Sequence, residues 1–412
     1  MTEHGLPEPA GAPGMPLTPA ERQDLRQRFE ARLARSTSRT DDVFAFRPVD
    51  RPPLAVTAAL YFLFGRRPES IPGALFDDPA VMLADQERRL YDHLRNVDDD
   101  FVPYVMPWFG TVVAASAFGC KVGFPSRQDP AVDPAWYPVQ SVEDVDALRI
   151  PDPEQDGLMP TVLRYLRHWR EHSVLPIGIT DHQGPLTTAN QLMGYDKLIY
   201  LMYDEPEAAH RLMDKVTTGL IRWIRAQKAV IGDALDYGIG DQQVHTGRHG
   251  GVWFSDDDAV LVNADLYREF VVPYNSRLLT EFGGGFLHYC GNATHHADNF
   301  LATEGLKGLN IFALHNIASV KTLQERLMGK VAILLCDFTP SDYGAYIDTV
   351  ARELDTRGLA LLSEYSPIVG LLPSGRYDSL DRPDDGARAV HARFLEAYAR
   401  RGGPSGPGAS AS

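Results

Sequence analysis

The sequence lacks the features that mark several large classes of protein. Its 412 residues contain only three cysteines, which are too few for a disulfide framework, and their number is odd. No run of about 18 apolar residues is present, as a membrane-spanning helix would need. Residues 1–17 have neither a basic start nor an apolar segment, so we expect no secretory signal peptide. These absences predict a cytoplasmic protein.

Positive charge is also scarce. Forty Lys and Arg residues stand against 55 Asp and Glu residues, which gives a formal net charge of −15. Such a charge repels both nucleic acid phosphates and anionic lipid headgroups. We therefore expect no nucleic acid partner and no membrane partner, and look for a small-molecule substrate.

What the chain does have is enough apolar sequence for a large core, since 44% of its residues are hydrophobic. Residues 1–16 and 401–412 are the exception, and their polar, Gly- and Pro-rich composition predicts disordered tails. Residues 17–400 are expected to form one domain. It begins with a helical extension, because the sequence Thr18-Pro19-Ala20-Glu21 has the pattern of a capping box with proline at the first helical position.

Eight short apolar runs alternate with helical patterns, the clearest helix starting at Pro206 and ending at Gly232. Each run is far enough from the next for a crossover helix, and most are apolar on both faces, as buried parallel strands are. The pattern predicts a single (β/α)8 TIM barrel, an α/β fold. Its expected strands are residues 54–59, 101–106, 174–180, 234–239, 285–288, 308–312, 331–335 and 359–362.

Polar side chains follow these runs, where the active site of such a barrel lies. They include two of the three cysteines and several of the thirteen histidines. We expect proton transfer from His182, Asp241 or Glu364, metal binding by His288, Cys290, Cys336 or Glu364, and substrate contacts from Gln183, Tyr289, Asn292, His315 and Tyr365.

The sharpest signal is His288-x-Cys290, because residues i and i+2 of a strand point the same way and can bind one ion together. Zinc in a catalytic site takes three protein ligands and leaves a fourth position open. We expect the third ligand to be Glu364 or Cys336, unless all four residues bind the ion and leave no open position. A plain core thiol is the competing interpretation of Cys336. Cys120 is expected to be a core thiol. The acidic run 256–258 is expected to form a solvated helix start, with one carboxylate as its cap.

Several segments together resemble the uroporphyrinogen decarboxylase superfamily, and within it the zinc-dependent corrinoid methyltransferases. They are residues 98–103 (DDDFVP), 117–119 (AFG), 184–189 (GPLTTA), 265–275 (DLYREFVVPYN) and 284–292 (GGFLHYCGN). The resemblance implies a single (β/α)8 barrel and assigns two zinc ligands to His288 and Cys290. The family's third ligand is a cysteine on the last strand, where this sequence has Glu364. It further implies a thiol substrate bound to zinc, and a methyl donor that is a corrinoid on a partner protein.

The resemblance also separates this chain from the decarboxylase itself, which binds its polyacidic substrate with an arginine-rich N-terminal segment. Residues 57–62 here read TAALYF, so those charge-assisted contacts are missing and uroporphyrinogen is not the expected substrate. Three functions remain open: a zinc-dependent methyltransferase, a metal-assisted decarboxylase or lyase on a small substrate, and a non-catalytic zinc- or corrinoid-binding protein. In the lyase, His182 or Asp241 would move a proton.

Overall fold

The structure is a computed structural model that describes residues 15–57, 71–125, 128–232, 249–340, 342–364 and 383–401. The expected tails lie almost wholly outside these ranges, so the domain limits at residues 17 and 400 stay predictions. None of the described helices is both long and apolar enough to span a bilayer.

Six parallel strands form the main sheet, in the order β1-β8-β7-β6-β5-β4. Five of them coincide with expected strands, and β5, β7 and β8 run on into the polar residues that follow the apolar runs. The strands are β1 (Leu54–Thr57), β4 (Val252–Ser255), β5 (Gly285–Cys290), β6 (Leu306–Phe312), β7 (Ala332–Phe338) and β8 (Leu359–Glu364).

Two irregular segments complete the ring. The expected strands 101–106 and 174–180 were wrong as regular strands, because they pair only through the isolated bridge between Val105 and Ile177. Pro103, Pro107 and Pro176 lack the backbone N–H that a continuous ladder needs.

A few hydrogen bonds join these segments to the sheet. The Asp100 N–H donates to the Leu54 carbonyl at 2.8 Å, and the Gly184 N–H donates to the Ser255 carbonyl at 2.6 Å. The predicted (β/α)8 barrel is therefore confirmed, with two of its eight positions held by irregular backbone.

The strand that pairs with β5 is β4, which was not among the expected strands. The expected strand at residues 234–239 lies outside the described residues. The missed run Val-Trp-Phe-Ser is buried throughout and is followed directly by Asp256, so it has the pattern of the other strands.

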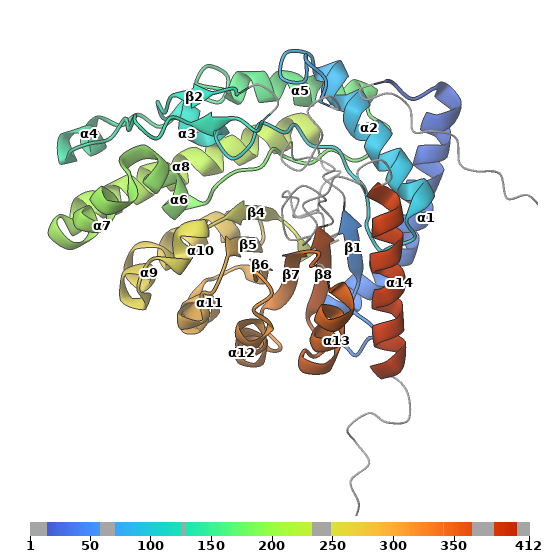
Figure 1. The fold of residues 1–412 in the computed structure, drawn as a ribbon. Helices are drawn as coiled ribbons and strands as arrows, with labels where there is room; N and C mark the ends of the chain where they lie inside the picture. Colours follow the sequence, from blue (N-terminus) through green and yellow to red (C-terminus); the bar gives the residue numbers. More distant parts are fainter. Residues whose placement is uncertain are drawn as a thin grey trace, which may run out of the picture.

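Helices cover the outside of the barrel. In Figure 1, α9 to α13 lie in succession along the outer side of β4 to β8. The helices are α1 (Pro19–Phe44), α2 (Pro79–Asn96), α3 (Val113–Ala117), α4 (Val142–Ala147), α5 (Met159–His172), α6 (Pro185–Met193), α7 (Tyr195–Asp204), α8 (Pro206–Ile231), α9 (Ala264–Phe270), α10 (Val272–Glu281), α11 (Ala297–Ala302), α12 (Ile317–Leu327), α13 (Tyr343–Glu353) and α14 (Pro383–Arg401).

Shorter elements fill the connections, namely the 3-10 helices η3 (Asp257–Val260) and η4 (Thr294–His296) and the antiparallel pair β2 (Val122–Gly123) and β3 (Ala131–Val132). The two helices expected most clearly are confirmed. Thr18 and Glu21 form the reciprocal capping box of α1, and α8 ends at Ile231 with Gly232 as its C-cap, whose φ is +83°.

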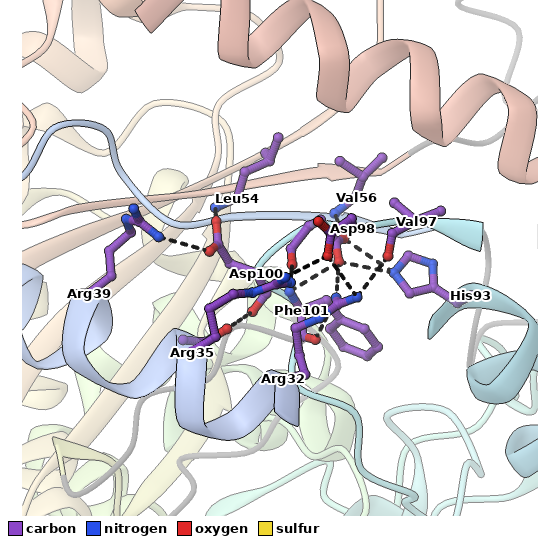
Figure 2. A network of polar contacts seen from close by, with 12 residues as sticks. Arg32, Arg35, Arg39, Leu54, Val56, His93, Val97, Asp98, Asp100 and Phe101 are labelled. Atoms are coloured by element: carbon purple, nitrogen blue, oxygen red, sulfur yellow. Dashed lines mark hydrogen bonds and ion pairs between the residues drawn. The ribbon is translucent and has the colours of Figure 1, made fainter. Parts of the chain in front are cut away.

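The helical extension α1 is joined to the barrel by a buried ionic network, drawn in Figure 2. Arg32 donates to the Asp99 carboxylate at 2.5 Å, and Asp99 also accepts from the backbone N–H of Val56 at 2.7 Å. His93 approaches the same carboxylate at 3.2 Å. The network therefore connects α1, α2, β1 and the segment that follows Val97.

Two apolar clusters form the core. The larger one fills the space between the strands and the surrounding helices. The smaller one consists of residues of β4, β5, β7 and β8, with Phe44 at the end of α1 and the nearby Phe46 packed against it. Its members are Trp253, Phe286, Ala332, Leu334 and Ala360. Side chains on the same face of these strands, further toward their C-terminal ends, therefore point toward the barrel mouth.

Candidate metal centre

His288 and Cys290 lie on the same face of β5, as their spacing predicted. His288 Nε2 and Cys290 Sγ are 3.4 Å apart. The histidine is buried and the cysteine is exposed at the end of the strand. This distance allows one ion to contact a nitrogen and a sulfur donor together, at the end of the barrel where substrates bind.

A third donor comes from the turn after β4. Asp257 Oδ1 lies 3.6 Å from His288 Nε2, and the donor atoms of Asp257, His288 and Cys290 all lie within 4.8 Å of one another. Within the described ranges this is the one group of three such donors. A hydrogen bond at 2.7 Å from the Asp256 N–H to the His288 carbonyl holds the turn beside β5.

The acidic run is not the solvated helix start that the sequence suggested. Asp256 is fully buried, and accepts hydrogen bonds from Tyr267 Oη at 2.7 Å and from Asn275 Nδ2 at 3.1 Å. Burial raises the pKa of Asp256 to about 7, and its two hydrogen bonds oppose that rise. Neither η3 nor α9 is capped by these carboxylates, because Asp256 makes no side-chain cap and Asn263 caps α9.

Asn310 of β6 fixes the orientation of the His288 ring. The two residues face each other in the strand register, and Asn310 Oδ1 lies 2.5 Å from His288 Nδ1. Asn310 Nδ2 donates to the Leu334 carbonyl at 3.0 Å, so the amide oxygen must point toward the histidine. His288 Nδ1 therefore carries the proton and Nε2 presents its lone pair to the donor cluster. Burial lowers the pKa of His288, which favours this neutral ring.

The two residues expected to supply the third ligand lie on neighbouring strands of the same sheet. Cys336 is fully buried among apolar side chains, and is in register with Phe312 and Leu362. Glu364 is the last residue of β8, is 4% exposed, and is in register with Phe338 and Thr57. Both stand in the C-terminal halves of their strands, but neither belongs to the three-donor group.

His182 and Gln183 lie between the third barrel segment and β4. His182 is 1% exposed, its Nδ1 is 3.3 Å from the Thr180 carbonyl, and its Nε2 has no hydrogen-bond partner among the residues that the structure describes. Burial lowers the pKa of His182 to about 4, so the ring is neutral at physiological pH. Gln183 is bridged to Ser255, the residue in register with His288. Both therefore lie near the mouth.

The other predicted substrate contacts are dispersed. Tyr289 points away from the His288 face and stacks on Phe300 of α11, at a ring distance of 5.8 Å. Asn292 is exposed, and its side chain accepts from the Thr294 N–H at 3.0 Å. His315 has φ +63°, and its Nε2 lies 2.8 Å from the Phe338 carbonyl. Asp241 and Tyr365 fall outside the described residues.

Cys120 has the structural role expected of it. The thiol is 7% exposed and belongs to the main apolar cluster, and burial raises its pKa to about 12.

Comparison with known proteins agrees with this architecture. The family model for uroporphyrinogen decarboxylase (URO-D) matches residues 102–342, more than half of the chain. The chain belongs to the URO-D family. The match covers the donor cluster, but it ends before β8 and Glu364.

Curated relatives of this URO-D family member include both a decarboxylase and a methyltransferase. A uroporphyrinogen decarboxylase of Syntrophotalea carbinolica is 32% identical over 177 residues, which are 40% of this chain and 45% of the relative. A "methylated-thiol--coenzyme M methyltransferase" of Methanosarcina mazei is 28% identical over 192 residues, 46% of this chain and 47% of the relative. In both, the matched part spans less than half of the relative's length.

A solved structure of a methyltransferase from Methanosarcina mazei has the same fold. It superposes with a TM-score of 0.61 and 18% sequence identity, covering 88% of this chain and 99% of the other. That similarity confirms the predicted architecture over nearly the whole length of the solved chain.

Proposed function

We propose that this URO-D family member is a zinc-dependent methyltransferase that methylates a thiol or a similar small nucleophile. The observation that supports this most directly is the cluster of Asp257, His288 and Cys290 at the barrel mouth. The curated methyltransferase relative makes the same reaction class reasonable for this barrel.

The donor set fits zinc. It offers one imidazole nitrogen, one sulfur and one carboxylate oxygen, all of which zinc binds, and three protein ligands leave a fourth position for substrate. Zinc, when bound, would lower the pKa of a coordinated substrate thiol and so present its sulfur as a nucleophilic thiolate. The methyl donor in this proposal is a methylated corrinoid on a partner protein.

The surrounding residues have separate tasks in this proposal. Asn310 holds the His288 ring with Nε2 toward the ion site, through the 2.5 Å contact at Nδ1. His182, neutral because its pKa is lowered to about 4, orients the substrate through Nε2 and does not carry the proton. With Asp257 as the third ligand, Glu364 becomes the group that accepts the substrate proton.

A metal-assisted decarboxylase or lyase is the second candidate, because the chain also matches a curated decarboxylase. The same cluster would then polarise a substrate carbonyl. Release of CO2 from a small carboxylated substrate, without methyl transfer to a thiol, would favour this function.

The metal content of the purified protein tests the site. We expect about one zinc per chain in the wild type and little zinc in the His288→Ala, Cys290→Ser double variant, which loses two of its three ligands. Stoichiometric zinc in the double variant would refute the site. Zinc affinity is then compared among the single variants Asp257→Asn, Cys336→Ser and Glu364→Gln to identify the third ligand. We expect only Asp257→Asn to weaken zinc binding.

The reaction itself is tested with methylcobalamin and a panel of small thiols, by following the cobalamin absorbance and the thioether product. We expect turnover that is lost in the double variant, and turnover reduced in Glu364→Gln with zinc still bound. A protein that binds zinc but transfers no methyl group to any thiol, with or without corrinoid protein, would contradict the proposed reaction while leaving the metal site intact.

A further inference from the structure

A cavity of about 550 Å³ opens at the N-terminal ends of the barrel strands. Its wall includes Gly283, which precedes β5, Lys307, the second residue of β6, and Lys330, which precedes β7. The strands are parallel and rise about 3.3 Å per residue, so the six residues of β5 put this cavity roughly 20 Å from the metal centre. Barrel enzymes place their chemistry at the other end, so the proposed reaction does not account for it.

The cavity carries positive charge on an otherwise acidic protein. Lys307 and Lys330 are exposed, and no described residue forms an ion pair or a hydrogen bond with either side chain. His249 lines the same cavity, and its Nε2 lies 3.1 Å from the Asp41 carboxylate. Two ammonium groups beside one concave surface, in a chain of net charge −15, create a local site that attracts anions.

Aromatic side chains also line the cavity. Phe44 packs against the buried Phe286 at a ring distance of 5.3 Å and against His249 at 5.2 Å. Phe46 lines the cavity as well and packs on the inner apolar cluster. Fixed aromatic rings give a flat surface on which a planar group can stack.

Two of the lining residues are glycines, whose lack of a side chain leaves space in the cavity. Gly283 and Gly329 have φ of +75° and +82°, as residues that follow the helices α10 and α12 often do. A Cβ added at either glycine would meet no atom within 4 Å. The volume lies within the 300–1,000 Å³ that is typical of small-molecule sites.

We propose that this cavity is a second ligand site, which binds a small organic anion composed of a flat ring and a phosphate or carboxylate group. The lysines bind the anionic group as point charges, and the phenylalanine wall stacks on the ring. The competing explanation is that the lysines only stabilise the C-terminal ends of α10 and α12, in which case no ligand binds. This inference does not depend on the proposed methyl transfer.

Calorimetric titration of the full chain with 1-naphthyl phosphate tests the proposal. We expect saturable binding that weakens as salt rises, because both cations are exposed. Inorganic phosphate and 1-naphthol each lack half of the ligand and should bind at least tenfold more weakly. 1-Naphthoate, compared with the phosphate ester, shows which anionic group the lysines prefer.

Variants locate the binding. The Lys307→Ala, Lys330→Ala double variant should weaken the ester at least tenfold, whereas Lys197→Ala, an exposed lysine on α7, should not change it. Because both cavity lysines are exposed, their loss should leave thermal unfolding unchanged. Equal affinity in the wild type and the double variant, or no binding at millimolar ligand, would overturn the proposal. Loss of binding in the His288→Ala, Cys290→Ser variant would instead assign the ligand to the metal centre and would also overturn it.

Discussion

The contact between Asn310 and His288 gives the most discriminating prediction about the metal centre. Asn310 is fully buried, and its side-chain hydrogen bonds within the described residues join it to His288 and to the Leu334 carbonyl rather than to Asp257 or Cys290. Any effect of Asn310 on zinc affinity must therefore act through the His288 ring. Loss of such an orienting partner typically costs tenfold to a hundredfold in metal affinity. We expect Asn310→Ala to raise the zinc dissociation constant by that factor, about 1.4–2.8 kcal/mol.

The same variant should destabilise the metal-free fold. It removes two hydrogen bonds, at 2.5 and 3.0 Å, and leaves the buried Leu334 carbonyl without its amide donor. We expect a loss of about 1–3 kcal/mol in the free energy of unfolding. Asn310→Asp keeps the acceptor for His288 Nδ1 and should retain zinc affinity within a few-fold.

Competition with a chelator at pH 7.5 measures the zinc affinity, and urea unfolding of the metal-free protein measures stability. Gln324→Ala is the matched control, because Gln324 is also a buried amide with two backbone hydrogen bonds, to Asp355, away from the metal centre. It should cost stability without changing zinc affinity. Wild-type zinc affinity in Asn310→Ala, with affinity lost in His288→Ala, would refute the role of Asn310.

Three further predictions follow from the structure and the composition. His182→Gln should make the metal-free protein less sensitive to acid. The pKa of His182 is about 4 in the folded protein, below its value in the unfolded chain. The neutral ring therefore contributes to the free energy of unfolding above pH 6.5, and this contribution is lost as the pH falls toward 4. Urea unfolding of the wild type at a series of pH values should show a loss of about 3 kcal/mol from this group. Arg32→Met should lower the free energy of unfolding by about 3–5 kcal/mol, because it leaves the buried Asp99 carboxylate without its arginine; a loss below about 1 kcal/mol would contradict this. At physiological salt the protein should not retard DNA in a gel, and a robust, salt-sensitive shift would contradict the interpretation of its charge.

Much of the barrel could be predicted from local patterns in the sequence. The runs that became β5 to β8 are short and apolar on both faces, which is the pattern of buried parallel strands. The two-residue spacing of His288 and Cys290 was enough to place both side chains on one face. The capping box at Thr18 likewise fixed the start of α1, because its contacts span only three residues.

Two barrel segments illustrate the limit of that approach. An apolar run predicts a strand, but Pro103 and Pro176 removed the N–H groups that regular pairing requires. The run before Asp256 has the pattern of a buried strand but was not among the expected strands, because hydrophobicity alone does not say which run pairs with β5.

The donor cluster depended on tertiary structure in the same way. Asp257 lies 31 positions before His288, and it reaches the imidazole because the Asp256 N–H pairs with the His288 carbonyl. Asn310 lies 22 positions after His288, and only the β5–β6 register places the two side chains opposite each other. The sequence by itself therefore determined which residues share a strand face, since that follows from the backbone period of two. Only the tertiary structure decided which faces meet, because strand register depends on the packing of the whole barrel.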